Sequence, residues 1–267
     1  MSGRAILTAP RVTRSFPGEI LMTMIRRRLF AVLAACAAAA ALMGSATTAV
    51  AAPLSDDARS AAMSGSIAAA QSPSACSDAA FNLYGGRWKS MLRWAYRGSS
   101  TPGYLNQAAV VEVLKRSFRN VTTARNDCGR ADNVSATSAY DGITSRKPSV
   151  GSMGHCTNAD GLNVIGFGDL PRGVLAVTCT RFDGTRIEET DVRISTRFRW
   201  ALSVAACSFD ELLEPTMTHE LGHSYGLAHV GERRHGRLTM STMSDGPCSN
   251  AESTLGLGDM LGLEQLY

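Results

Sequence analysis

Apolar and polar residues along the chain form three patterns typical of β-strands. Residues 91–96 (MLRWAY) alternate between apolar and polar side chains, as expected of a half-buried strand. The runs 174–179 and 187–194 are rich in β-branched residues, and residues 182–185 between them contain Asp-Gly, a turn signal. We therefore expect these last two strands to form a hairpin.

A helical pattern follows Asn106, a residue type that often caps a helix N-terminus. The apolar positions at three- and four-residue spacing are Ala109, Val110, Val113, Leu114 and Phe118. Strand, helix and further strands in this order predict an α/β (α+β) fold, a twisted mixed sheet with helices packed on it.

The first 51 residues have the pattern of a secretory signal peptide. Three arginines (26–28) precede an apolar stretch of residues 29–43, and Ala49-Val50-Ala51 is a typical cleavage site. The apolar core is shorter than the roughly 20 residues that span a bilayer, so we favour a cleaved signal over a membrane anchor. Because residues 1–23 precede the charged start, Met24 or Met22 is an alternative initiator.

The segment after this leader divides into a linker and a folded domain. Residues 52–75 are rich in Ala and Ser and contain few large apolar side chains, which predicts a linker or short pro-segment. Residues 76–267 have the size of a single domain, which we expect to be monomeric. The mature form is expected to be secreted and to have no transmembrane anchor. The alternative is a lipid anchor, because residues 33–36 (LAAC) resemble a lipoprotein box ending at Cys36.

The cysteine count also suggests an oxidising compartment. After removal of the leader, an even number of cysteines remains: Cys76, Cys128, Cys156, Cys179, Cys207 and Cys248. Three disulfides are the simplest expectation for an exported chain, although six cysteines allow 15 connectivities.

Composition and charge exclude several classes of protein. With 45% hydrophobic and 19% charged residues, the chain is neither collagen-like nor disordered. Six of its 27 basic residues but one of its 23 acidic residues lie in 1–51, so the remainder is close to neutral. The densest later basic cluster is Arg233, Arg234 and Arg237, which is small for nucleic-acid binding. We therefore expect no nucleic-acid partner.

Residues 219–229 (HELGHSYGLAH) contain the strongest chemical signal in the chain. On a helix, His219 and His223 project from one face one turn apart, at a spacing that suits two imidazoles on one zinc ion. Glu220 lies about 100° further round, where it can reach a water molecule on the metal but is poorly placed as a ligand. Gly226 can adopt a positive φ and turn the chain so that His229 supplies a third nitrogen.

Three imidazoles leave the fourth position of a tetrahedral zinc ion for water, which is typical of a catalytic site. Pro215 fits only in the first turn, so the helix should begin within residues 212–215. A site that binds zinc without catalysis is the alternative, although it gives no role to Glu220.

This segment resembles the metzincin metalloproteases, whose signature is HExxHxxGxxH followed by a turn that contains methionine. Residues 238–241 (LTMS) and 241–244 (STMS) are both similar to that Met-turn. The matrixin-like spacing from the third histidine favours Met240, with Met243 as the alternative. The family places this methionine as a hydrophobic floor beneath the metal.

The resemblance to the matrixin branch continues on both sides of the motif. Residues 255–267 are similar to its closing helix, and residues 163–167, 174–177 and 187–192 are similar to its strands above the cleft. It implies an edge strand that pairs with an extended substrate through Leu175, Ala176 and Val177. It also implies a Cys207–Cys248 disulfide, since the zinc helix and the Met-turn are neighbours in metzincins. For the remaining cysteines we expect Cys156–Cys179 and Cys76–Cys128.

The activity implied by the resemblance is that of a secreted zinc endopeptidase acting on proteins or peptides. Glu220 would activate the water on a single zinc ion held by His219, His223 and His229. A non-catalytic zinc-bearing adhesion or binding module is the alternative. The chain lacks the cysteine switch of matrixins and the Pro and Tyr that commonly follow their Met-turn, and calcium binding has no clear motif here.

Overall fold

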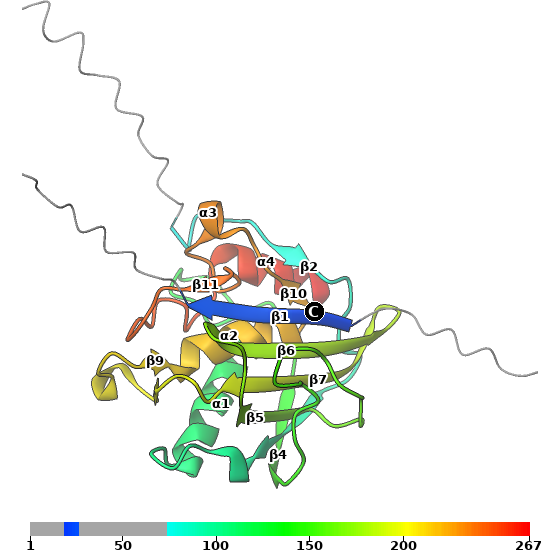
Figure 1. The fold of residues 1–267 in the computed structure, drawn as a ribbon. Coiled ribbons are helices and arrows are strands. Elements are labelled where there is room, and N and C mark those ends of the chain that lie inside the picture. The colour runs from blue at the N-terminus through cyan, green and yellow to red at the C-terminus, as the bar shows by residue number, and fades with distance from the viewer. Residues whose placement is uncertain (1–18, 27–73) are drawn as a thin grey trace, which may run out of the picture. The chain divides into compact units, whose positions relative to one another are not determined.

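The computed structural model describes residues 19–26 and 74–267, and its central feature is a seven-stranded mixed sheet (Figure 1). The strands lie in the order β11-β1-β6-β7-β5-β3-β4. β6 runs antiparallel to both of its neighbours, whereas the other adjacent strands are parallel. The strand bounds are β1 Glu19–Arg26, β3 Leu92–Arg97, β4 Ser138–Thr144, β5 Val164–Gly168, β6 Val174–Asp183, β7 Arg186–Ser195 and β11 Met243–Ser244.

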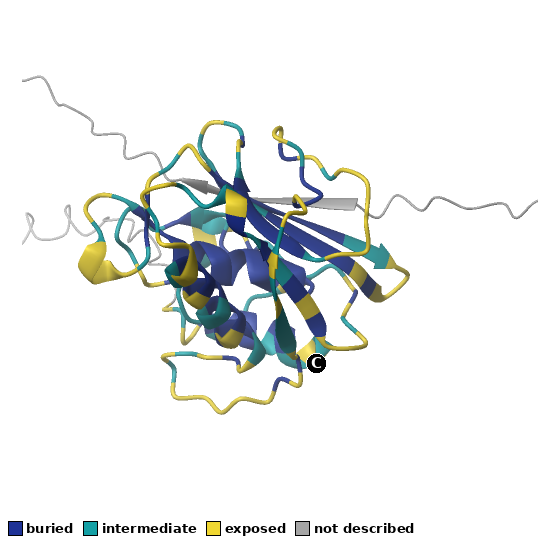
Figure 2. Ribbon diagram, turned by 90° about the horizontal axis from the view of Figure 1, so that it is seen from below, coloured by how far each residue is buried: buried dark blue, intermediate teal, exposed yellow. Residues whose placement is uncertain are grey.

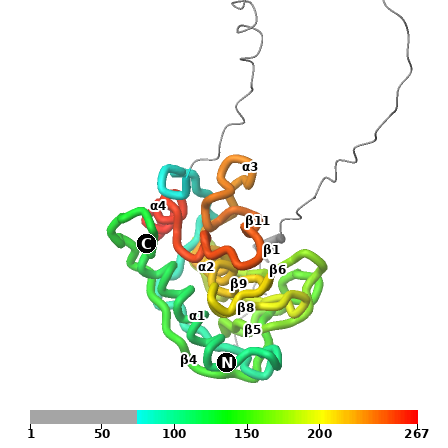
Figure 3. The backbone as a smooth tube through the Cα atoms, turned by 90° about the vertical axis from the view of Figure 1, so that its left-hand side faces the viewer, coloured from blue at the N-terminus to red at the C-terminus, as the bar shows by residue number. Residues whose placement is uncertain are grey.

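The helices α1 and α2 pack against each other, and α2 also lies against β6 and β7 (Figure 3). The helix bounds are α1 Gln107–Thr122, α2 Leu213–Ser224, α3 Glu232–His235 and α4 Leu257–Leu266, with 3-10 turns at Gly98–Ser100 and Val204–Ala206. Two short strand pairs lie outside the main sheet: β2 Asn82–Leu83 with β10 Leu227–Ala228, and β8 Trp200–Ala201 with β9 Glu211–Leu212.

The core lies between the sheet and these helices, where the buried residues gather in Figure 2. Trp94 of β3 stacks on Phe118 of α1 with a distance of 4.5 Å between ring centroids. The apolar face predicted for the helix after Asn106 supplies much of this core, and the Asn106 side chain accepts a hydrogen bond from the backbone N–H of Ala109. Burial of this face stabilises the helix against the sheet.

The sequence pattern predicted the coarse architecture correctly: the fold is a mixed α+β arrangement of sheet and helices. The strand expected at 91–96 is β3, and the two expected hairpin strands are β6 and β7. The structure also pairs the cysteines as Cys76–Cys128, Cys156–Cys179 and Cys207–Cys248, the same pairs that we expected. Such bridges are compatible with an extracellular protein.

Two features near the N-terminus differ from the expectation. Ala75, assigned to the linker, is already part of the fold, since its carbonyl oxygen accepts a hydrogen bond from Leu257 N. Residues 19–26 form strand β1 in the main sheet, where the sequence predicted no element. The signal-peptide core, Cys36, the cleavage site after Ala51 and residues 52–73 lie outside the described residues. Within the described part, no helix has the length and hydrophobicity needed to cross a membrane.

Candidate metal centre

Helix α2 carries the first half of the motif and is buried on almost every side. It begins at Leu213, so Pro215 lies in the first turn, as its missing N–H requires. His219, Glu220 and His223 all have a relative exposure of 0%. A polar motif buried so deeply must have partners within the protein, because buried polar groups are costly when they lack hydrogen bonds.

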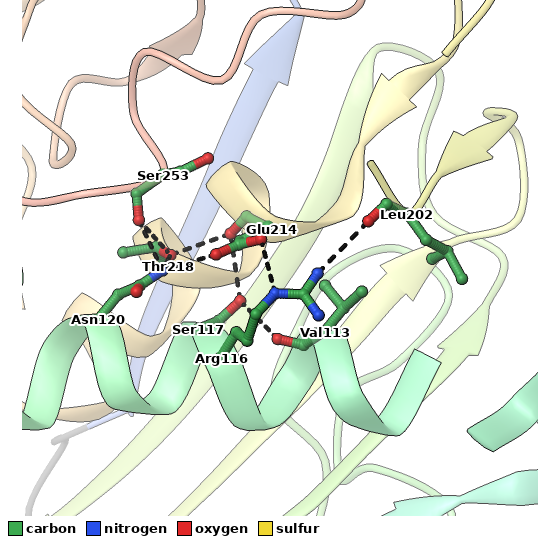
Figure 4. A network of polar contacts seen from close by, with 8 residues as sticks. All are labelled: Val113, Arg116, Ser117, Asn120, Leu202, Glu214, Thr218 and Ser253. Carbon is green, nitrogen blue, oxygen red and sulfur yellow. Dashed lines mark hydrogen bonds and ion pairs between the residues drawn. The ribbon is translucent and has the colours of Figure 1, made fainter. Parts of the chain in front are cut away.

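The N-terminal half of α2 is fixed to α1 by a polar network (Figure 4). Arg116 Nε donates to Glu214 Oε2 at 3.1 Å, and Asn120 Nδ2 donates to Glu214 Oε1 at the same distance. Asn120 Nδ2 also lies 2.7 Å from the carbonyl oxygen of Ser253, which leads to α4. These bonds fix the position of α2 and therefore the direction in which its histidines point.

The glycine between the two helical histidines makes room for Met240. A Cβ atom built on Gly222 would lie 2.3 Å from the Met240 sulfur, so no larger residue fits without displacing it. Met240 itself is buried, with 1% exposure. The structure thus places Met240 directly under the histidine-bearing turn, whereas Met243 lies in β11.

The chain turns back after α2 because Gly226 adopts a φ of +98°. An L-residue is disfavoured at this φ, and a Cβ atom there would also lie 2.4 Å from Gly86 O. After the turn, β10 pairs with β2, and Asn82 Nδ2 donates to the carbonyl oxygen of His229 at 2.8 Å. These contacts bring His229 opposite the two helical histidines.

The three histidines converge through their Nε2 atoms. The Nε2–Nε2 distances are 3.1 Å between His219 and His229, 3.1 Å between His219 and His223, and 3.0 Å between His223 and His229. The centre of such a triangle lies about 1.8 Å from each corner, so an ion just outside its plane can reach the Zn–N distance of ~2.0–2.1 Å to all three. Within the described residues, this is the group of His, Cys, Asp and Glu side chains that could hold a metal ion.

Hydrogen bonds on the far side of two rings fix their tautomers. His219 Nδ1 lies 2.6 Å from Thr239 O, and His223 Nδ1 lies 2.9 Å from Leu227 O. Carbonyl oxygens only accept, so each Nδ1 carries the proton and each Nε2 presents a lone pair towards the other rings. Lone pairs that face one another at about 3 Å repel each other, and a cation between them would remove this repulsion, so the three rings could hold a metal ion.

Burial keeps these imidazoles neutral. It lowers the pKa of His219 to about 3, with a further contribution from His229, and that of His229 to about 4. Burial also lowers the pKa of His223 well below its usual value, aided by the two neighbouring rings. Since a metal binds only the neutral imidazole, the site is ready to accept a cation at neutral pH.

One carboxylate oxygen of Glu220 contacts β6, and Glu220 is not part of the group of side chains that could hold a metal ion. Thr178 Oγ1 donates to Glu220 Oε2 at 2.5 Å, and it is also 3.1 Å from the Glu220 carbonyl oxygen. Thr178 and Glu220 are both fully buried, with 0% exposure. The carboxylate is therefore held in one orientation next to the metal ligands, as a group that moves a proton requires.

The sequence pattern did not identify three polar residues that shape the site. The Asp259 carboxylate accepts hydrogen bonds from the backbone N–H groups of Thr239, Met240 and Gly256 at 2.9–3.2 Å, which fixes the turn that carries Met240. Burial raises the pKa of Asp259 to about 6, although these three donors lower it. Thr178 is the second such residue. The third is Tyr84, whose ring centroid lies 6.1 Å from that of His223, and burial raises the pKa of Tyr84 to about 12.

The predicted substrate strand forms one side of the site, and its outer edge is paired. Within β6, Ala176 pairs with Met24 and Val177 pairs with Thr23 of β1, which runs antiparallel to β6. At its other end β1 runs parallel to β11, with Ile25 opposite Met243. The space between β6 and β11 therefore accommodates an extended chain.

No family model matches this chain, and no curated protein matches its sequence. The resemblance to metzincins therefore depends on the motif and on the geometry of the site.

Proposed function

We propose that the protein is a secreted zinc endopeptidase of the metzincin type. The observation that carries this proposal is the convergence of three neutral imidazoles, whose Nε2 atoms are 3.0–3.1 Å apart. A buried glutamate, Glu220, follows the first of these histidines, and its Oε2 atom accepts a hydrogen bond from Thr178. A metal site built only to stabilise the fold would be closed by a fourth protein ligand. Here the fourth residue of the site is Glu220, which Thr178 orients by a hydrogen bond. A carboxylate held in this way can accept a proton, which favours a catalytic site over a structural one.

His219, His223 and His229 would hold the metal, and a soft nitrogen set of this kind suits zinc better than calcium or magnesium. Zinc bound with an open position polarises a carbonyl group and acidifies water. Glu220 takes a proton from the water molecule whose oxygen attacks the carbonyl carbon of the peptide. When the C–N bond breaks, Glu220 returns that proton to the departing nitrogen, so the products are a carboxylic acid and an amine. Transfer of the acid's remaining proton to the amine gives a carboxylate and an ammonium ion at neutral pH.

The polypeptide substrate would lie extended along β6. Cleavage of the leader, which the sequence predicts, removes β1 and frees the outer edge of β6. A substrate segment then takes the place of β1, antiparallel to β6 and parallel to β11, with backbone hydrogen bonds supplying affinity. This mode accepts unfolded or extended segments and excludes regular helices.

The test is hydrolysis of a fluorogenic peptide library by the processed protein, with and without a chelator. We expect cleavage that a chelator abolishes and that stoichiometric zinc restores. A protein that binds one zinc ion per chain but cleaves no peptide or unfolded protein would instead support the alternative, a zinc-bearing binding module.

A further inference from the structure

Two arginines that follow the third histidine in the chain have no charge partner among residues 19–26 and 74–267. Arg233 and Arg234 belong to α3 and are exposed, and within the described residues neither forms an ion pair. The neighbouring polar groups are already engaged, because His235 is paired with Asp78 at 2.9 Å and Glu232 forms a hydrogen bond with Ser241. This short helix therefore presents two uncompensated positive charges.

The same two arginines line a cavity of about 430 Å³, which we call the α3 pocket. Its walls are residues 80–82 on one side and residues 230, 231 and 233–235 on the other. Asn82, which lines the pocket, also donates to the carbonyl oxygen of His229. One residue of the pocket lining is thus hydrogen-bonded to the backbone of the third histidine, and the pocket is large enough for an amino-acid side chain.

The α3 pocket lies close to the proposed substrate path. In Figure 1, β1 lies between β6 and the segments that carry β2 and α3. Val230, which lines the pocket, forms a parallel bridge with Ser241, two residues before β11, the strand that pairs with β1. Side chains of an extended peptide alternate between opposite directions, so a peptide in the place of β1 would present every second side chain to the same face of the sheet, next to the segment that Val230 joins to the pocket.

We propose that the α3 pocket binds an acidic side chain of the polypeptide substrate through Arg233 and Arg234, and so selects substrates with a glutamate or aspartate near the cleaved bond. This inference rests on the proposed function. Guanidinium groups bind carboxylates through paired N–H donors, which makes arginine better suited to this role than lysine. Because both arginines are solvent-exposed, each ion pair is weak, and the two together favour an acidic residue roughly three- to tenfold.

The test uses the full chain expressed with its own leader in a secreting host, with the processed, zinc-loaded product purified. Peptides from one neutral parent sequence carry a single Glu, Gln or Lys at successive positions. At one position we expect kcat/KM for Glu to exceed that for Gln roughly three- to tenfold and to exceed that for Lys further. The preference should shrink in 1 M salt, where charges are screened beyond about 3 Å.

Two variants locate the effect. In the Arg233→Ala/Arg234→Ala double variant, the Glu-to-Gln ratio should fall to about one. Arg237→Ala is the matched control, because Arg237 is exposed in the same basic cluster but does not line the pocket, and this variant should keep the ratio. Thermal melting of both variants verifies that they are folded.

Three outcomes would overturn the inference: no position at which Glu is preferred, a preference that survives the double variant, or an equal loss in Arg237→Ala. The last would indicate a diffuse cationic surface for polyanions. If no peptide in the series and no unfolded protein is cleaved, the proposed function fails separately. The α3 pocket is then tested by fluorescence anisotropy with the same labelled Glu and Gln peptides, and equal binding of the two would refute it.

Discussion

The floor of the candidate site and its edge differ in what satisfies their hydrogen-bonding groups. We define the floor as α2, residues 239–240 and α4, and the edge as β6 and β11. In the floor, side chains bind backbone groups of the same domain, as Asp259 does for the N–H groups of Thr239 and Met240. In the edge, backbone groups bind β1, a segment that the predicted leader cleavage removes.

This difference suggests that the floor holds the metal ligands and that the edge binds the substrate. A floor whose polar groups have permanent partners can hold metal ligands in one geometry, which the chemistry requires. An edge whose partner is exchangeable can bind many sequences through backbone hydrogen bonds. Changes in the floor should therefore alter metal content, stability or kcat, and changes in the backbone pairing of the edge should alter KM. A side chain of β6 that contacts α2, as Thr178 contacts Glu220, should act like a residue of the floor.

The largest expected effect concerns the catalytic role that we propose for Glu220. Glu220→Gln removes the proton acceptor but leaves all three imidazoles, so zinc content should stay near one per chain. Peptide hydrolysis should fall by roughly 10²- to 10⁴-fold, as for the loss of a positioned acid–base group. Steady-state kinetics and metal analysis of the same preparation test both statements.

His229→Ala is the comparison variant for Glu220→Gln. It removes a ligand, so zinc and activity should be lost together. Activity of Glu220→Gln close to that of the unaltered protein would refute the role of the glutamate, and zinc loss in that variant would make Glu220 a ligand.

The next effect concerns the disulfide that fixes the edge. Cys207–Cys248 joins residues before α2 to residues after β11 across a sequence separation of 41. Replacing both cysteines by alanine should lower the free energy of unfolding by roughly 3–4 kcal/mol on the chain-entropy model. Because β11 loses its anchor, KM should rise while zinc content stays near one per chain.

Cys76–Cys128 provides the matched control for this disulfide, because its sequence separation of 52 is similar and neither cysteine belongs to the edge. Removing it should cost comparable stability in chemical denaturation but leave KM unchanged. An equal rise of KM in both double variants would contradict the assignment of Cys207–Cys248 to the edge.

Asp259→Ala tests the floor. The substitution leaves three buried N–H groups without their acceptor, which should cost about 3 kcal/mol and lower Tm by roughly 6–12 °C. Zinc affinity should fall as well, since the Thr239 carbonyl oxygen orients His219. Gln265→Ala, an exposed position on the same helix, is the control. Unchanged zinc affinity in Asp259→Ala would show that the turn does not depend on this carboxylate.

Thr178→Val should have a smaller effect, limited to kcat. Valine has nearly the same shape but no hydroxyl group, so Glu220 loses the donor that orients it and kcat should fall about tenfold. KM and zinc content should not change, which distinguishes a positioning role from a general loss of structure. Thr180→Val is the control on the same strand, because the Thr180 hydroxyl lies 3.1 Å from Thr190 Oγ1 and 3.5 Å from the backbone carbonyl oxygen of His223. Equal losses of kcat in the two variants would refute the positioning role of Thr178.

The sequence predicted the floor better than the edge, for a physical reason. His219, Glu220 and His223 lie within two turns of the same helix and Gly226 follows its C-cap residue, so their spacing alone places them together. Asp259 is 19 residues from Met240, and its carboxylate accepts a hydrogen bond from the backbone N–H of Met240. A contact of this kind leaves no local sequence pattern. Thr178 could have been suspected only as a polar residue in an otherwise apolar strand.

Strand β1 illustrates the same limit at the edge. Its pairing depends on the outer edge of β6, about 150 residues further along the chain, and no local periodicity reveals a distant partner. Residues 26–28 and the apolar stretch that follows have the pattern of a signal peptide, so the sequence predicted a leader, and no strand, for residues 19–26. The coarse fold was predictable because the periodicity of β3, α1, β6 and β7 is local.

The smallest predicted effect tests the edge directly, with the sequence of β1 as a probe. A synthetic peptide of residues 19–26 (EILMTMIR) should compete with a fluorogenic substrate for the processed protein, since it matches the register seen along β6 and β11. Backbone pairing by a flexible octapeptide is weak, so we expect an inhibition constant of about 0.1–1 mM and a competitive pattern, with KM raised and kcat unchanged. An octapeptide of the same composition in scrambled order is the control. Equal competition by the scrambled peptide would show that the edge responds to hydrophobic content and not to the β1 register, and no competition by either would remove β1 as a mimic of the substrate.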